Sequence, residues 1–155
     1  MDADNNRLLG CFVPCHGCID NAIHSAAGLQ LRDECSRLMA QQGRPEPTGQ
    51  AKLTGGYNLP ARYVLHTVGP IIHGRVTTQD RELLASCYRS CLKLASEHEL
   101  QSVAFCCIST GEFHFPNQEA ARIAVQTVKE FLQAPTTVRK VVFKDIDAKI
   151  YHDLL

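Results

Sequence analysis

The hydrophobic positions of this chain recur at helical spacing in some segments and form short uninterrupted runs in others. After Asp20, which stands where a helix N-cap would, apolar residues follow at three- and four-residue steps and predict a helix that is interrupted near Gly28. Residues 79–97 and 119–132 repeat this spacing and predict two more core-facing helices. The apolar positions of the first helix are Ile23, Ala27, Leu31, Cys35 and Leu38.

Apolar runs with the length of buried strands lie between and after these helices. Residues 63–68 end at Gly69-Pro70, residues 103–108 end at Ser109-Thr110-Gly111, and residues 138–143 form a last strand. Because such strands alternate with helices, we expect an α/β sheet covered on both faces, with ligands bound at loops beyond the strand ends. One domain over residues 1–155 is the simplest organisation.

The start of the chain does not fit this pattern. An α/β sheet needs a central strand early in the chain, but residues 1–10 are polar and turn-like. The sequence therefore predicts either a small sheet or a domain whose first strands are missing.

Composition excludes several classes of protein. The chain has 155 residues, 45% of them hydrophobic, which is typical of a globular domain. Its 16 Lys and Arg balance its 16 Asp and Glu, so we expect no nucleic-acid partner. The absence of a long apolar run or a signal-peptide pattern predicts a cytoplasmic protein without a membrane partner.

The eight cysteines fall into two groups. Cys35, Cys87, Cys91, Cys106 and Cys107 lie among apolar neighbours, as core cysteines do. The other three, Cys11, Cys15 and Cys18, crowd around His16 in a loop with Gly and Pro, and thiolate and imidazole donors suit zinc. The alternative is a reduced cysteine cluster without a metal.

The number of ligands decides what such a metal does. Four ligands would close the site and make it structural, whereas three would leave a position open to water or substrate. Adjacent residues in an extended loop tend to point in different directions, so Cys11, His16 and Cys18 form the geometrically easier set of three. A four-ligand set that includes Cys15 stays open.

A second group of candidate residues lies between a strand and a helix, from Ser109 to Pro116. Backbone N–H groups of such a loop form an anion cradle, and Gly111 permits close approach of a phosphate, although a plain turn has the same composition. Asp20 is an N-cap in the simplest interpretation, and a carboxylate that orients or deprotonates a water in the functional one. His24 and His66 are interpreted as structural.

Several segments together match a known family. The segments are Gly10 to Gly28, Thr48-Gly49-Gln50-Ala51, Thr54-Gly55-Gly56-Tyr57-Asn58-Leu59-Pro60-Ala61, His66-Thr67-Val68-Gly69-Pro70 and Ile108-Ser109-Thr110-Gly111. Over nearly the whole chain, they resemble the macrodomain family, whose members bind and in some cases hydrolyse ADP-ribose. Cys11, His16 and Cys18 fit the Cys-x4-His-x-Cys spacing of its zinc-dependent subgroup.

The resemblance implies a three-layer α/β/α fold with a mixed sheet and a zinc-dependent activity that removes mono-ADP-ribose from proteins. The implied substrate is an acidic side chain of a carrier protein modified by a sirtuin-like ADP-ribosyltransferase. Asn5 corresponds to the second Asn of the family's Asn-Ala-x-Asn element, near the distal ribose, and Asp20 to the Asp of the loop-to-helix segment. The implied residues for the diphosphate and distal ribose are Ser109, Thr110, Gly111 and Phe113.

Two departures from the family pattern matter. Asp2 stands where the family has its first Asn, and the strands that precede this element have no counterpart, so we expect an N-terminally truncated macrodomain. Two alternatives to the hydrolase therefore stay open. One is an ADP-ribose-binding reader with a structural zinc, and the other is an inactive fragment.

Overall fold

The computed structural model describes residues 1–3, 5–11 and 18–143. The strands are β1 (Asp2–Ala3), β2 (Ala51–Gly55), β3 (Tyr63–Thr67), β4 (Ser102–Phe105) and β5 (Lys140–Phe143). The helices are α1 (Ile19–Ala27), α2 (Leu29–Gln42), α3 (Thr78–Glu97) and α4 (Asn117–Leu132). All three segments expected to be helical are helical, and the first is divided at Gly28, whose φ is +90°, into α1 and α2.

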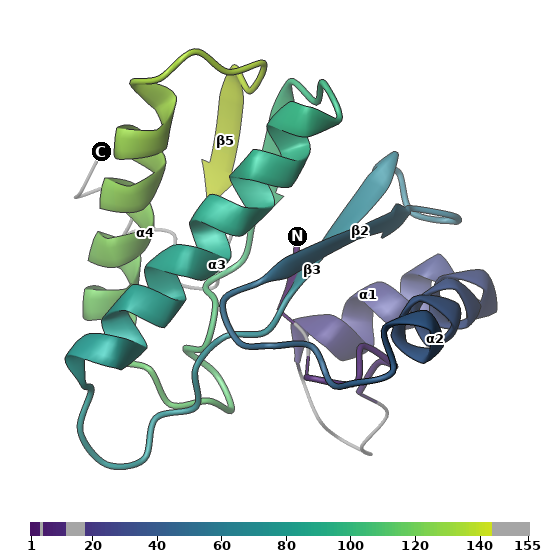
Figure 1. The fold of residues 1–155 in the computed structure, drawn as a ribbon, viewed down its shortest axis with the longest axis horizontal. Helices are drawn as coiled ribbons and strands as arrows, with labels where there is room; N and C mark the ends of the chain where they lie inside the picture. The colour runs from purple at the N-terminus through teal and green to yellow at the C-terminus, as the bar shows by residue number, and fades with distance from the viewer. Residues whose placement is uncertain (4, 12–17, 144–155) are drawn as a thin grey trace.

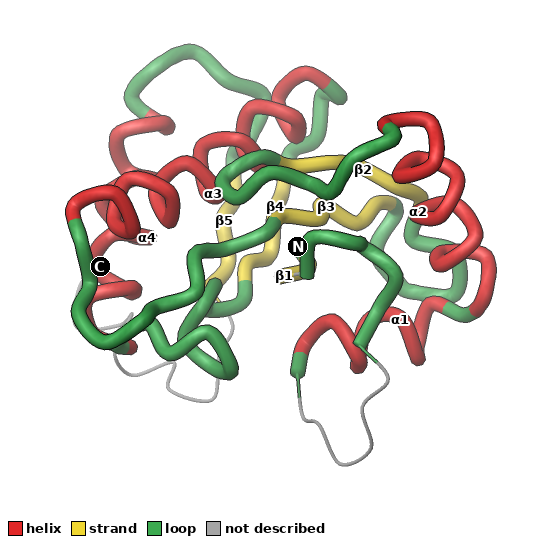
Figure 2. Tube along the Cα trace, turned by 60° about the horizontal axis from the view of Figure 1, so that its bottom comes forward, coloured by secondary structure: helices red, strands yellow, loops and turns green. Residues whose placement is uncertain are grey.

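The described strands form a mixed three-stranded sheet, in the order β1-β3-β2, and a parallel two-stranded sheet of β4 and β5. β3 pairs with β1 in parallel and with β2 in antiparallel, and β4 pairs with β5 in parallel. The amino group of Met1 donates to the carbonyl of Ala104 at 2.9 Å, and Figure 2 shows β4 and β5 continuing the row of strands beyond β1. Residues 1–10, which are polar and turn-like in sequence, thus contribute the two-residue strand β1.

Helices cover both faces of the sheet, as the apolar strands predicted (Figure 1). Leu65 of β3 belongs to the larger apolar core, together with residues of α3 and α4. Its neighbour Val64 faces the other way and packs with Ala27, Leu31 and Cys35 of the α1 and α2 layer. The strand alternates between two cores, so the architecture has three layers.

Three details differ from the sequence-based expectations. The N-cap of α1 is Cys18, and Asp20 is a buried residue of the first turn. β4 ends at Phe105, before the predicted end at residue 108, and the buried Ile108 lies in the loop that follows, where its N–H donates to the Tyr88 hydroxyl at 3.5 Å. β2 was not expected because its residues are only partly apolar and it lies at the edge of its sheet.

Candidate functional site

The two described cysteines of the predicted metal loop lie next to each other. Burial raises the pKa of the Cys18 thiol, and the hydrogen bond and charge of the Cys11 thiol raise this pKa further. Both side chains are half-buried. Two adjacent thiols at the ends of a short loop fit a soft divalent metal such as zinc. His16, the third predicted ligand, and Cys15 lie outside the described residues.

The two residues expected to be catalytic also meet. The side-chain amide of Asn5, just after β1, donates to Oδ2 of Asp20 at 3.5 Å. Asp20 is only 3% exposed, and its charge acts on the Cys18 thiol, so the carboxylate lies close to the predicted metal loop. Asn5 is fixed in turn by the N–H of Arg7, which donates to its Oδ1 at 2.9 Å.

A buried histidine cluster continues from Asp20 into the core. His24 Nε2 lies 3.5 Å from Asp20 Oδ1, and burial lowers the pKa of His24 although the Asp20 charge acts in the opposite direction. His66 Nε2 lies 2.8 Å from Thr54 Oγ1 and 3.9 Å from Cys35 Sγ. The sequence indicated three separate core residues, and gave no sign that His24, Cys35 and His66 converge.

The donor atoms of His24, Cys35 and His66 lie within 4.8 Å of one another, so they form a possible metal-binding group. Tetrahedral zinc with bonds of about 2.0 to 2.3 Å holds its ligand atoms roughly 3.3 to 3.8 Å apart. Cys35 Sγ and His66 Nε2 are 3.9 Å apart, just beyond this range, and Thr54 already bonds this His66 nitrogen. In its present geometry the group is a buried core cluster that would have to contract slightly to hold an ion.

The loop after β4 is held by backbone hydrogen bonds in a tight conformation. The N–H of Phe115 donates to the Ser109 carbonyl at 2.8 Å, and that of His114 donates to the Gly111 carbonyl at 3.0 Å. Ser109 has a φ of +65°, in the left-handed region. The Thr110 hydroxyl donates to the Cys107 carbonyl at 3.0 Å. A Cβ on Gly111 would meet no atom within 4 Å, so the tip of this loop is open on that side.

The loops after β3 and β4 lie together. The N–H of Ile72 donates to the carbonyl of Phe113 at 2.9 Å. Gly69 packs so closely under Ser109 that a Cβ there would lie 2.0 Å from the Ser109 hydroxyl oxygen. Gly69 was interpreted from the sequence as a turn residue, but its main role is to make room for the candidate phosphate loop.

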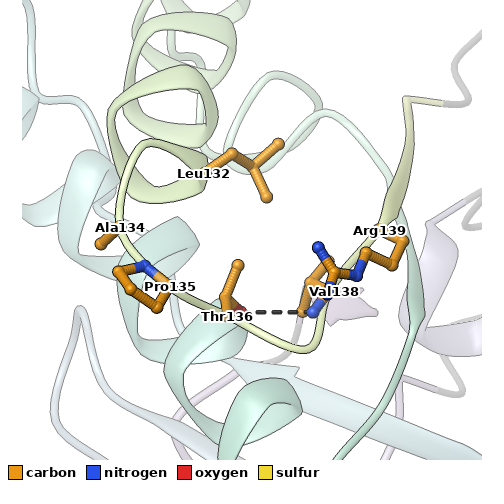
Figure 3. A pocket seen from close by; sticks show the side chains of 6 residues that line it. All are labelled: Leu132, Ala134, Pro135, Thr136, Val138 and Arg139. Carbon is orange, nitrogen blue, oxygen red and sulfur yellow. Dashed lines mark hydrogen bonds between the residues drawn. The ribbon is translucent and has the colours of Figure 1, made fainter.

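A separate surface hollow of about 440 Å³ lies between the end of α4 and the start of β5 (Figure 3). None of the residues predicted to bind or react lines it. Its one charged side chain among the described residues is that of Arg139, and no carboxylate, histidine or cysteine lines it. The lining residues are Leu132, Ala134, Pro135, Thr136, Val138 and Arg139. Helix α4 has 16 residues, so the hollow lies roughly 22 Å along α4 from the end that adjoins the loop after β4.

Among the described residues, none of the helices is both long and apolar enough to cross a lipid bilayer.

Comparisons with known proteins find relatives that match most of this chain. The family model "Macro domain" matches residues 1–124. The chain is 51% identical over 158 residues to a protein-ADP-ribose hydrolase of Treponema medium, covering 100% of this chain and 60% of that protein. It is 52% identical over 157 residues to a protein-ADP-ribose hydrolase of Staphylococcus aureus strain MSSA476, covering 99% of this chain and 59% of the relative. The chain thus spans about 60% of the length of these curated relatives.

Solved structures show the same fold. A mutant macrodomain of Oceanobacillus iheyensis with ADPR superposes with a TM-score of 0.86 at 39% identity, covering 99% of this chain and 81% of that one. A Trypanosoma brucei macrodomain in complex with ADP-ribose gives a TM-score of 0.81 at 39% identity, covering 98% of this chain and 60% of that one.

Proposed function

The chain belongs to the macrodomain family, and from this premise we propose that it is a zinc-dependent hydrolase that removes mono-ADP-ribose from modified side chains of proteins. The observation that carries the proposal is the meeting of Asn5, Asp20 and the two thiols of Cys11 and Cys18 after β1. The names of the relatives at 51% and 52% identity support the same activity.

Asn5 and Asp20 have different roles in this proposal, one in binding and one in the reaction. In this proposal Asn5 donates a hydrogen bond to the distal ribose and also keeps Asp20 in place, since its amide already bonds that carboxylate. Asp20 positions the attacking water. A buried carboxylate held by a neighbouring amide is suited to this task because its oxygens have a fixed direction.

The loop after β4 binds the diphosphate and the distal ribose in this proposal. The contacts come from Ser109, Thr110, Gly111 and Phe113. The open side of Gly111 leaves room for a phosphate near the backbone. Because the Phe113 carbonyl is bonded to Ile72, the loop has one preferred position before a ligand arrives. Such preorganisation reduces the entropy cost of binding.

Cys11, Cys18 and His16 would hold the zinc, which when bound supplies a positive charge that orients and polarises the substrate near the scissile bond. Two thiolate donors reduce that charge, so orientation of the substrate is the larger part of its contribution. The proposal also includes the cytoplasm as the place of action, and as partners a carrier protein modified on an acidic side chain and its sirtuin-like ADP-ribosyltransferase.

The test is the release of ADP-ribose from a protein that carries glutamate-linked mono-ADP-ribose, with and without a chelator. We expect the Cys11→Ser variant and the chelated protein to lose hydrolysis while part of the ADP-ribose affinity remains in calorimetry. Asp20→Asn should lower turnover by about 100-fold or more, because the water loses its positioning group. Asp33→Asn, which changes an exposed carboxylate of α2, is the control and should not change turnover.

The other functions give different results in the same assay. Tight ADP-ribose binding without release by the wild-type chain would identify a reader, and no binding would identify an inactive fragment. Undiminished release by Cys11→Ser would refute a role for the metal loop.

A further inference from the structure

One residue contacts both cysteine-bearing ends of the metal loop. Asn21 lies in the first turn of α1, and its backbone N–H donates to the Sγ of Cys18 at 3.4 Å. Its side-chain Nδ2 donates to the backbone carbonyl of Cys11 at 2.5 Å, ten residues earlier in the chain. No spacing pattern in the sequence distinguishes this residue.

The backbone contact acts on the first sulfur. Cys18 is the N-cap of α1, so its Sγ takes the place that a Ser or Asp oxygen occupies in other helices. An N–H group and a helix N-terminus both favour negative charge, and a thiolate is the form of cysteine that binds metal. Because this contact uses the backbone, α1 itself fixes where the Cys18 sulfur points.

The side-chain contact acts on the other end of the loop. The Asn21 amide holds the Cys11 carbonyl, so it ties residue 11 to the helix that carries Cys18. The two thiols are close enough to hydrogen-bond. Without the amide, the Cys11 end would lose a direct link to α1, and the spacing of the two sulfurs would depend on the rest of the loop.

We propose that Asn21 is the positioning residue of the metal loop: its side chain sets the place of Cys11 relative to Cys18, so that both sulfurs bind one divalent ion. This inference rests on the proposed function, since it takes Cys11 and Cys18 as ligands. It assigns Asn21 no contact with the ion. Residues that orient ligands in this way typically contribute 10- to 100-fold to metal affinity.

The experiment compares metal binding by the full chain and its variants. Zinc is removed with a chelator, and Zn²⁺ affinity is then measured by competition with a chromophoric chelator. Cobalt replaces zinc in a second series, because the thiolate-to-cobalt absorption reports how many sulfurs bind the ion and in what geometry. The variants are Asn21→Ala, Asn21→Leu, Cys11→Ser and, as the control on the same helix, Ser25→Ala, which changes an exposed side chain.

Asn21→Leu separates positioning from folding. Leucine has nearly the shape of asparagine and is a good helix former, but it cannot donate to the Cys11 carbonyl. We expect both Asn21 variants to bind Zn²⁺ about 10- to 100-fold more weakly and to change the cobalt spectrum. The metal-free melting temperature of Asn21→Leu should stay at the wild-type value, and Ser25→Ala should match the wild type in every measurement.

Two results would overturn the inference in distinguishable ways. Wild-type Zn²⁺ affinity and cobalt spectrum in both Asn21 variants would show that the side chain does not position the ligands, while leaving the loop site intact. Wild-type zinc affinity in Cys11→Ser would show that the loop is not the metal site, and would remove the zinc part of the proposed function together with the inference.

Discussion

Two glycines near the loop after β4 have opposite surroundings. A Cβ on Gly69 would lie 2.0 Å from the hydroxyl oxygen of Ser109 and 2.7 Å from a methyl group of Ile108, whereas a Cβ on Gly111 would contact nothing within 4 Å. The first glycine is therefore required by packing. The second has no structural need to be glycine, and a bound phosphate would explain it.

Replacing each of these two glycines with alanine should separate an effect on stability from an effect on ligand binding. Gly69→Ala should lower the free energy of unfolding by about 1 to 3 kcal/mol, because Ser109 and Ile108 must move. Gly111→Ala should change it by less than about 0.5 kcal/mol and yet weaken ADP-ribose binding. Urea unfolding and calorimetry measure the two effects. Equal ADP-ribose affinity in Gly111→Ala and the wild type would contradict the proposed phosphate contact.

For single residues, the sequence predicted which residues belong to the candidate site better than it predicted which of them are in contact. Asn5 and Asp20 were named through the family resemblance, and the structure brings them within 3.5 Å. Asn21 was missed because its contact with the Cys11 carbonyl depends on how a loop folds back on a helix, which no spacing pattern reveals. Asp20 was wrongly expected to be the N-cap, since cysteine is a weak acceptor and Cys18 is not a typical cap.

Helix α3 begins with a reciprocal pair of hydrogen bonds. The Thr77 hydroxyl accepts from the N–H of Asp80 at 3.1 Å, and the Asp80 carboxylate accepts from the N–H of Thr77 at 2.8 Å. These bonds satisfy two N–H groups that the helix cannot bond internally. They fix the start of the longest described helix, which packs against both β2 and β3.

Removing this cap should have a pH-dependent cost. Thr77→Ala should destabilise the protein by about 1 kcal/mol at pH 7. Hydrogen bonds from Thr77 hold the pKa of Asp80 below its ordinary value of 3.8, so this part of the stability is present above that pH and is lost as the pH falls through the lower, folded-state pKa. The difference between Thr77→Ala and the wild type should therefore shrink in strong acid.

Urea unfolding between pH 7 and pH 2 measures this effect, with Thr78→Ala as the control because Thr78 is exposed on the same turn. A constant difference across that range would contradict a contribution from the ionised Asp80.

The length of each helix or strand decided whether the sequence could predict it. The four helices and the strand at 63–67 follow strong periodicity or long apolar runs, and all were expected within a few residues. β1 has two residues, too few for any period, and β2 is a partly apolar edge strand. Both form because β3 offers its backbone on each side, a property of the assembled sheet.

At the scale of the whole molecule, the candidate site residues lie in segments that follow the ends of strands. The segments after β1, β3 and β4 supply the Asn5–Asp20 pair, Gly69 and the Ser109 loop. Strand β3 joins the two helical layers, since Val64 and Leu65 pack into different cores. A ligand at these strand ends would contact segments from both layers and should stabilise the whole domain.

ADP-ribose should therefore raise the melting temperature. At a concentration of 100 times its Kd, a ligand of the native state stabilises by about 2.7 kcal/mol, which for a domain of this size is roughly 5 to 10 °C. Thermal unfolding with increasing ADP-ribose measures the shift. Arg139→Ala, at the hollow beyond the far end of α4, should leave the shift unchanged, and its loss in that variant would place the ligand at the hollow.

The exposed turn at Gln133 to Pro135, which joins α4 to β5, has a practical consequence. Exposed loop tips tolerate insertions, and this one lies a whole helix length away from the candidate site. A peptide tag inserted there would fasten the domain to a sensor chip with the loops after β1, β3 and β4 facing the flow, so that the immobilised protein can be tested directly for binding of modified targets.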